Sequence, residues 1–95
     1  MSPTILEIKK RANPILKEFD VSKSFLFGSY ARDESNKRSD IDILVEFRQE
    51  KSFLDFVALK LKLEKTLKKK VDLVTEDAIP QRIRQFIKQD QIEIL

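Results

Sequence analysis

The order of apolar and polar residues along the chain predicts helices that alternate with short strands. Ser2 is a helix N-cap signal, and Ile5, Ile8 and Ala12 follow it at helical spacing. These positions predict a first helix over about residues 3–12.

Asn13-Pro14 repeats this start signal a few residues later. The residue before a proline avoids the α region, so we expect a separate short helix through Leu16 and Phe19. One continuous, kinked helix is the alternative.

Three short runs of mostly apolar residues predict strands. They cover residues 23–27, 40–47 and 71–75. The first run ends at Gly28 and leads into a helical turn over 29–32 and a polar loop over 33–39. The second run, DIDILVEF, is apolar almost throughout, which is typical of a strand covered on both faces and predicts a central place in the sheet.

Two further helices are expected in the second half of the chain. Ser52 and Asp55 resemble a capping box, which opens a helix to about Lys69. One apolar stripe of this helix comprises Phe53, Phe56, Leu59, Leu63 and Leu67. This face is expected to pack in the core, with a docking surface as the alternative.

Pro80 begins the last helix, whose inward side chains are expected to be Ile83, Phe86 and Ile87. Residues 91–95 then form either a short edge strand or an extended tail. Together these elements predict an α/β (α+β) fold with a small mixed sheet of three to four strands. Its helices are expected mainly on one face.

Composition narrows the possible functions. With 95 residues, the chain is expected to form one domain over 1–95, without a separate substrate-recognition domain. It contains no cysteine and no histidine, so a metal must bind to oxygen ligands, and magnesium suits carboxylates together with substrate phosphates. A net charge of +3 permits nucleic-acid binding without indicating it. No apolar run suits a membrane span or a secretory signal, so a cytoplasmic location is expected.

Gly28 is the single glycine of the chain, and its position between a strand and Ser29 is therefore informative. Without a Cβ, the turn can let a phosphate approach its backbone N–H groups, and Ser29 can add a hydroxyl donor. An ordinary strand-ending turn is the competing interpretation.

Three aspartates lie in the predicted strands. Asp40 and Asp42 stand at positions i and i+2, so their side chains project from the same face. Asp72 lies in the third strand, and all three carboxylates can meet if that strand lies beside the second. Because gathered carboxylates repel one another, a divalent cation would stabilise them. A solvated strand start for Asp40 and an ion pair of Asp72 with Lys70 are the alternatives.

Gly28-Ser29, ten residues, and then Asp40-Ile41-Asp42 resemble the signature of the polymerase-β-like nucleotidyltransferases. The string GSYARDESNKRSDIDILVEF is similar to that of their smallest members, the minimal nucleotidyltransferases (MNT). The VDLVT strand resembles the one that carries the third carboxylate of this family. The likeness covers about residues 20–95, but Asp33 stands where many relatives have glycine.

The resemblance implies a nucleotidyltransferase-like fold and transfer of a nucleoside monophosphate, AMP from ATP, to a hydroxyl acceptor. Two magnesium ions would be held by Asp40, Asp42 and Asp72, which would be the catalytic residues. Gly28 and Ser29 would bind the terminal phosphates. Arg32 would either neutralise phosphate charge or pair with a nearby carboxylate, such as Asp33, Glu34 or Asp55.

The implied partner is a HEPN-domain toxin, with this chain as its antitoxin and a tyrosine of the toxin as acceptor. Two alternatives remain open at this point. The first is a catalytically silent antitoxin that neutralises a HEPN ribonuclease by forming a complex. The second is a transferase that acts on a small molecule or RNA. Nucleotide preference and oligomeric state are not indicated by the sequence.

Overall fold

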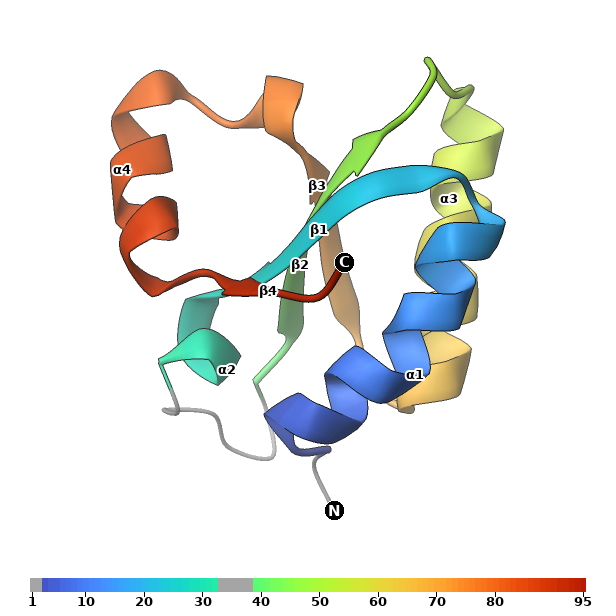
Figure 1. Ribbon diagram of the computed structural model, residues 1–95, viewed down its shortest axis with the longest axis horizontal. Coiled ribbons are helices and arrows are strands. Elements are labelled where there is room, and N and C mark those ends of the chain that lie inside the picture. The colour runs from blue at the N-terminus through green and yellow to red at the C-terminus, as the bar shows by residue number, and fades with distance from the viewer. Residues whose placement is uncertain (1–2, 33–38) are drawn as a thin grey trace.

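The fold is built around one four-stranded mixed sheet, in a computed structural model that describes residues 3–32 and 39–95 (Figure 1). The strands are β1 (Val21–Phe27), β2 (Ile41–Phe47), β3 (Val71–Thr75) and β4 (Ile92–Glu93). The helices are α1 (Ile5–Glu18), α2 (Gly28–Ala31), α3 (Phe53–Leu67), the 3-10 turn η1 (Glu76–Ala78) and α4 (Gln81–Asp90). The strand order is β3-β2-β1-β4, so β2 is central as predicted.

The connections explain the mixed directions of the strands. β1 runs antiparallel to both β2 and β4, whereas β2 and β3 are parallel. A parallel pair needs a crossover connection, and α3 provides it between β2 and β3. The parallel pairing places the beginnings of β2 and β3 side by side.

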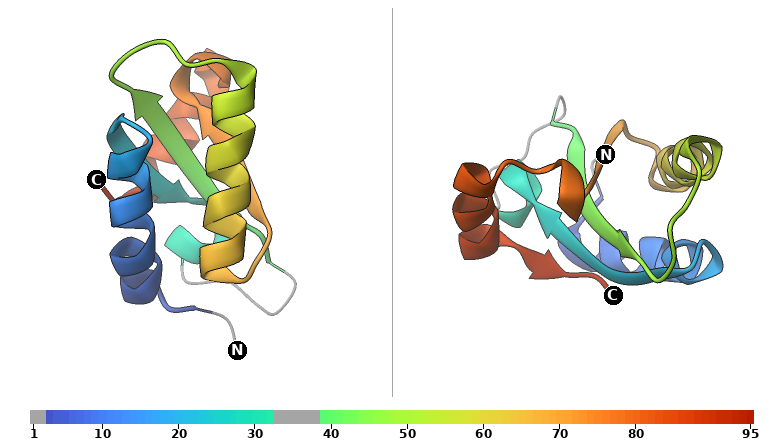
Figure 2. Two further views of the ribbon diagram at one scale, coloured as in Figure 1. Left: turned by 90° about the vertical axis from the view of Figure 1, so that its right-hand side faces the viewer. Right: turned by 90° about the horizontal axis from the view of Figure 1, so that it is seen from above.

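Two long helices, α1 and α3, lie next to each other on one face of the sheet (Figure 2). Their buried side chains are Ile8, Ala12, Ile15, Leu16, Leu59, Leu63 and Leu67. The strands present Leu26, Ile41, Ile43, Val45, Val71 and Leu73 to the same core. The short α2 and the more distant α4 lie on the other side of the sheet (Figures 1 and 2). This architecture confirms the predicted fold class.

The prediction of two separate N-terminal helices is wrong. α1 is continuous from Ile5 to Glu18 and contains Pro14. Its buried residues continue at helical spacing on both sides of Pro14, which is itself exposed, so burial of one face outweighs the missing proline N–H. The N-cap is Thr4, whose Oγ1 accepts a hydrogen bond of 3.2 Å from the Glu7 N–H. Ser2 lies outside the described residues.

The helix expected after Ser52 is present as α3, but it ends earlier than predicted. Ser52 caps α3 as predicted and accepts from the Asp55 N–H at 3.2 Å. The helix ends at Leu67 because Lys68 adopts a left-handed conformation with φ of 56°. Phe53 is 77% exposed, so its predicted place in the core is wrong. It is the first residue of α3.

Ile83 and Phe86 of α4 were also expected to face inward, and this is wrong. They are 41% and 68% exposed, so these two side chains face solvent. Residues 92–93 form the edge strand β4, and the Ile94 N–H donates to the Ser24 carbonyl at 2.8 Å. No helix in the described part of the chain is long and apolar enough to cross a bilayer.

Candidate functional site

Gly28 links β1 to α2 and lies directly against Asp42 of the neighbouring strand. Its φ of +74° is in the left-handed region, which favours glycine. A Cβ at this position would overlap Oδ2 of Asp42 and lie 3.0 Å from its Cγ. Any side chain at position 28 would therefore strain the backbone and displace the carboxylate.

The register of the sheet brings two of the predicted aspartates together. Asp42 is opposite Phe27 of β1 on one side and opposite Asp72 of β3 on the other. Directly opposed residues project from the same face of a sheet, and the carboxyl groups of Asp42 and Asp72 are in hydrogen-bond contact. The Asp72 strand therefore lies beside the Asp42 strand, which was the condition under which the carboxylates can meet.

Asp42 has a strongly perturbed acidity. Burial, which is the largest cause, and the negative charges of Asp72 and Asp40 together raise its pKa from an ordinary 3.8 to about 6. The hydrogen bond with Asp72 acts in the same direction, whereas the positive charge of Arg32 opposes it. The three acids are thus close enough to repel one another, and a proton or a cation would relieve this repulsion.

Asp40 and Asp72 are both exposed, whereas Asp42 is partly buried between them and the glycine turn. Asp40 immediately precedes β2 and acts on Asp42 through its charge. Within residues 3–32 and 39–95, no three acidic side chains already stand close enough together to form a metal-binding group. The donor chemistry nevertheless suits a hard cation, since every acidic side chain here offers carboxylate oxygens.

Ser29 and Arg32 follow Gly28 along the chain, in α2 and at its C-terminal end. Ser29 is partly buried in α2, one residue beyond Gly28. Arg32 caps the end of α2, and its Nη1 is 3.9 Å from Oδ2 of Asp90 in α4. The sequence did not suggest Asp90 as its partner, because nothing local connects residues so far apart. Asp33, the position of the departure from the MNT pattern, lies outside the described residues, as does Glu34.

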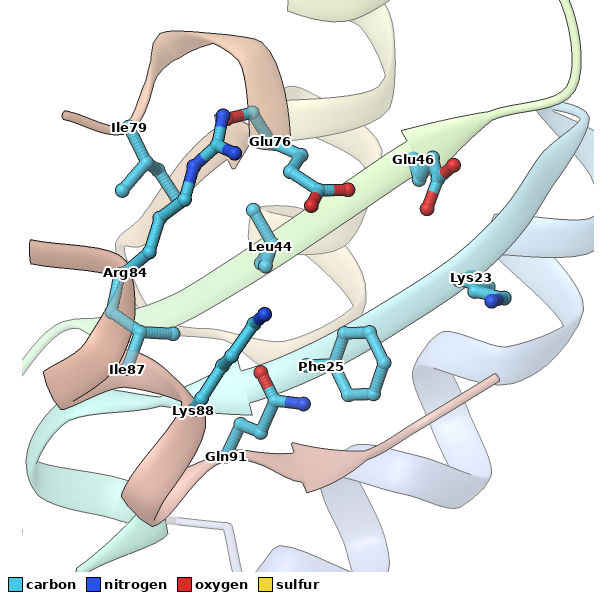
Figure 3. Close-up of a pocket in the computed structure, with 10 residues that line it drawn as sticks. All are labelled: Lys23, Phe25, Leu44, Glu46, Glu76, Ile79, Arg84, Ile87, Lys88 and Gln91. Atoms are coloured by element: carbon cyan, nitrogen blue, oxygen red, sulfur yellow. The ribbon is translucent and has the colours of Figure 1, made fainter. Parts of the chain in front are cut away.

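A pocket of about 210 Å³ opens on the same side of the sheet, between the strands and α4 (Figure 3). Phe25 and Leu44, which are opposed in the sheet, lie at its centre. Each stands two residues along its strand from Phe27 and Asp42, so both share the face of the acidic cluster. Sequence reasoning missed this pocket, although the alternation along β1 and β2 already placed Phe25 and Leu44 on that face.

Tyr30 belongs to the core and not to the open site. It is 2% exposed, and Lys69 Nζ lies 5.6 Å from the centre of its ring. Packing in the core accounts for this side chain.

Comparisons with known proteins agree with this geometry. Residues 8–94 match the family model described as the nucleotidyltransferase domain. A candidate protein adenylyltransferase of Methanocaldococcus jannaschii is 45% identical over 96% of this chain and 98% of its own length. The protein adenylyltransferase MntA of Thermococcus cleftensis is 35% identical over 82% of this chain and 79% of its own.

The fold also has a solved counterpart. A chain from the complex of the tri-AMPylated Shewanella oneidensis HEPN toxin with MNT antitoxin superimposes with a TM-score of 0.72. The match covers 93% of this chain and 69% of that chain, at 22% sequence identity. At this identity the likeness establishes the fold alone.

Proposed function

Since this chain belongs to the nucleotidyltransferase domain family, we propose that it transfers AMP from ATP to a tyrosine hydroxyl of a HEPN toxin and thereby acts as the antitoxin. The observation that carries the proposal is the meeting of Asp42 and Asp72 on opposed positions of β2 and β3, beside Gly28. Asp40 completes the cluster from the start of β2.

The carboxylate oxygens of the cluster have the donor chemistry that suits the two magnesium ions of the proposed reaction. Asp40 and Asp42 would hold both ions, and Asp72 would hold the one on the acceptor side. The supporting observation is the raised pKa of Asp42, because gathered carboxylates without a cation favour a bound proton. When bound, magnesium supplies neutralisation of the triphosphate and a lower pKa for the attacking hydroxyl.

The residues of the chain have distinct roles in the transfer. The acceptor oxygen forms a bond to the α-phosphorus while the bond to the bridging oxygen breaks, and pyrophosphate leaves. Asp72 accepts the hydroxyl proton, for which its exposed carboxylate is accessible to an acceptor on another molecule. Gly28 and Ser29 bind the terminal phosphates. Arg32, whose charge already acts on Asp42, balances the negative charge of the substrate.

The assignment of a protein acceptor rests on the relatives and on a protein of the same fold. Two relatives that match most of this chain are named protein adenylyltransferases. A protein of the same fold is an MNT antitoxin bound to an AMPylated HEPN toxin.

The test is label transfer to the purified HEPN partner. The expected result is Mg²⁺-dependent transfer from ATP labelled at the α-phosphate, no transfer from ATP labelled at the γ-phosphate, and loss of transfer in Asp42→Asn. Asp77→Asn, which changes an exposed aspartate outside the site, is the matched control. Absence of transfer, with toxin neutralisation that survives Asp40→Ala and Asp42→Ala, would refute the enzymatic proposal and favour a silent antitoxin. Label on RNA or a small molecule would instead refute the protein acceptor.

A further inference from the structure

The pocket between the sheet and α4 lies one row along the strands from the acidic cluster. Phe27 and Asp42 form one opposed pair on the open face, and Phe25 and Leu44 form the next pair on that face. Two residues along a strand correspond to roughly 7 Å. A ligand whose phosphates lie at the acidic cluster can therefore reach the pocket without leaving the sheet.

The pocket combines an apolar centre with polar edges (Figure 3). The Phe25 ring and Leu44 lie on the strands, while Ile79 and Ile87 line the opposite side. Leu44 is only 8% exposed, and Phe25 is partly buried. At about 210 Å³ the pocket is below the usual range for a complete small ligand, and it suits one flat heteroaromatic group.

Hydrogen-bonding groups surround this apolar centre. Figure 3 shows the Lys88 amino group directed toward Leu44, the Gln91 amide beside Phe25, and the Glu76 carboxylate entering from η1. Arg84 donates from Nη2 to the Glu76 carbonyl at 3.0 Å. Its buried Nε has no hydrogen-bond partner among the described residues. An apolar centre with donors and an acceptor at its edge is the pattern that recognises a nucleobase.

The geometry of the proposed displacement predicts that the nucleoside and the acceptor extend from the α-phosphorus in different directions. The groups of the proposed reaction lie in a row across the strands, from Gly28 after β1, through Asp42 in β2, to Asp72 in β3. In an in-line displacement the attacking and leaving oxygens lie on opposite sides of the phosphorus, and so along this row. The nucleoside is attached to the same phosphorus through a third oxygen, which extends at a large angle to the line between the attacking and leaving oxygens. The pocket lies in such a direction, along the strands.

We propose that this pocket holds the nucleobase of the nucleotide substrate, with the Phe25 ring as its contact surface. The assignment rests on the proposed transfer reaction, because that reaction determines how the triphosphate is oriented on the sheet. It makes Phe25 and the polar residues around it determinants of nucleotide binding and not of phosphate transfer itself.

Calorimetric titration in the presence of Mg²⁺ tests the assignment with two probes. α,β-methylene ATP carries base and phosphates, whereas tripolyphosphate carries phosphates alone. Phe25→Ala is expected to lower the affinity for the ATP analogue by about 5- to 150-fold, the range for loss of base stacking on an aromatic ring. The affinity of this variant for tripolyphosphate is expected to remain unchanged. Phe86→Ala, which truncates an exposed phenylalanine of α4, is the matched control.

A second measurement avoids any effect of Phe25→Ala on folding. Wild-type protein is irradiated with 8-azido-ATP and the labelled peptide is identified. Label in residues 23–25 or 84–91 supports the assignment, and label confined to other segments overturns it.

The remaining outcomes separate this inference from the proposed function. If Phe25→Ala binds both probes as the wild type does, the base lies elsewhere, while the transfer reaction stands. If that variant binds both probes normally but transfers AMP poorly to the partner, the pocket receives the acceptor and the assignment is wrong. If wild-type protein binds neither probe, the proposed function fails together with the pocket.

Discussion

Replacing Asp42 with asparagine should stabilise the metal-free protein while abolishing transfer. Burial and the charges of Asp72 and Asp40 raise the pKa of Asp42 from 3.8 to about 6, so the folded state binds a proton more tightly than the unfolded state. Stability from this proton is fully present below pH 3.8 and is lost as the pH rises through about 6. At pH 7.5 the ionised carboxylate therefore destabilises the fold.

The magnitude follows from the size of the pKa change. The difference between 3.8 and about 6 corresponds to at most about 3 kcal/mol. Because the side chain is partly exposed, solvent screening reduces this to about 1–2 kcal/mol. Asparagine removes the charge and can still donate a hydrogen bond to Asp72. For a domain of this size the gain corresponds to roughly 4–15 °C in Tm.

Thermal and urea unfolding in EDTA, from pH 4 to pH 8, measures this effect. The wild type should lose stability between about pH 4 and pH 6.5 relative to Asp42→Asn, and should regain it at pH 7.5 when Mg²⁺ and nucleotide are added. Asp77→Asn, an exposed control, should follow the wild type at every pH. An Asp42→Asn protein that is less stable than the wild type at pH 7.5 would refute the proposed repulsion among the three acids.

Three further substitutions test the fold and the site. Gly28→Ala should destabilise the protein by about 1–3 kcal/mol, because it combines a positive φ with a Cβ that overlaps Asp42. An unchanged urea midpoint would contradict this. Asp72→Asn should slow AMP transfer by about 10²- to 10⁴-fold with a Tm within a few degrees of the wild type, since the residue is exposed. Transfer at the wild-type rate would exclude it as proton acceptor. Leu63→Ala should cost about 2–5 kcal/mol in urea unfolding because Leu63 is fully buried. A smaller loss would place it outside the core.

Much of the fold could be predicted because its signals are local. The apolar run of β2 predicted a central strand, and the Ser52 cap predicted the start of α3. Pro14 misled the prediction for α1, since a proline signal is local whereas the burial that keeps the helix intact depends on the sheet and α3. Phe53 misled the prediction for α3 because helical spacing gives the face of a residue but does not show whether the first turn is covered by other elements.

The sequence could place Asp42 and Asp72 in strands that pair in the structure, but it could not predict the surroundings of the candidate site. Strand alternation gave the shared face of Asp40 and Asp42, and the resemblance suggested Asp72 as their neighbour. The contact of Gly28 with Asp42 and the approach of Arg32 to Asp90 depend on register and on the placement of α4. Such long-range geometry leaves no spacing pattern in the sequence.

Manganese binding, measured by electron paramagnetic resonance, tests the central claim most directly. Mn²⁺ suits the same carboxylate and phosphate oxygens as Mg²⁺, and the titration is carried out with α,β-methylene ATP present. Wild-type protein should bind two ions per chain, and both Asp42→Asn and Asp72→Asn should weaken that binding by about tenfold or more. Unchanged binding in both variants would contradict a metal-dependent site at these aspartates.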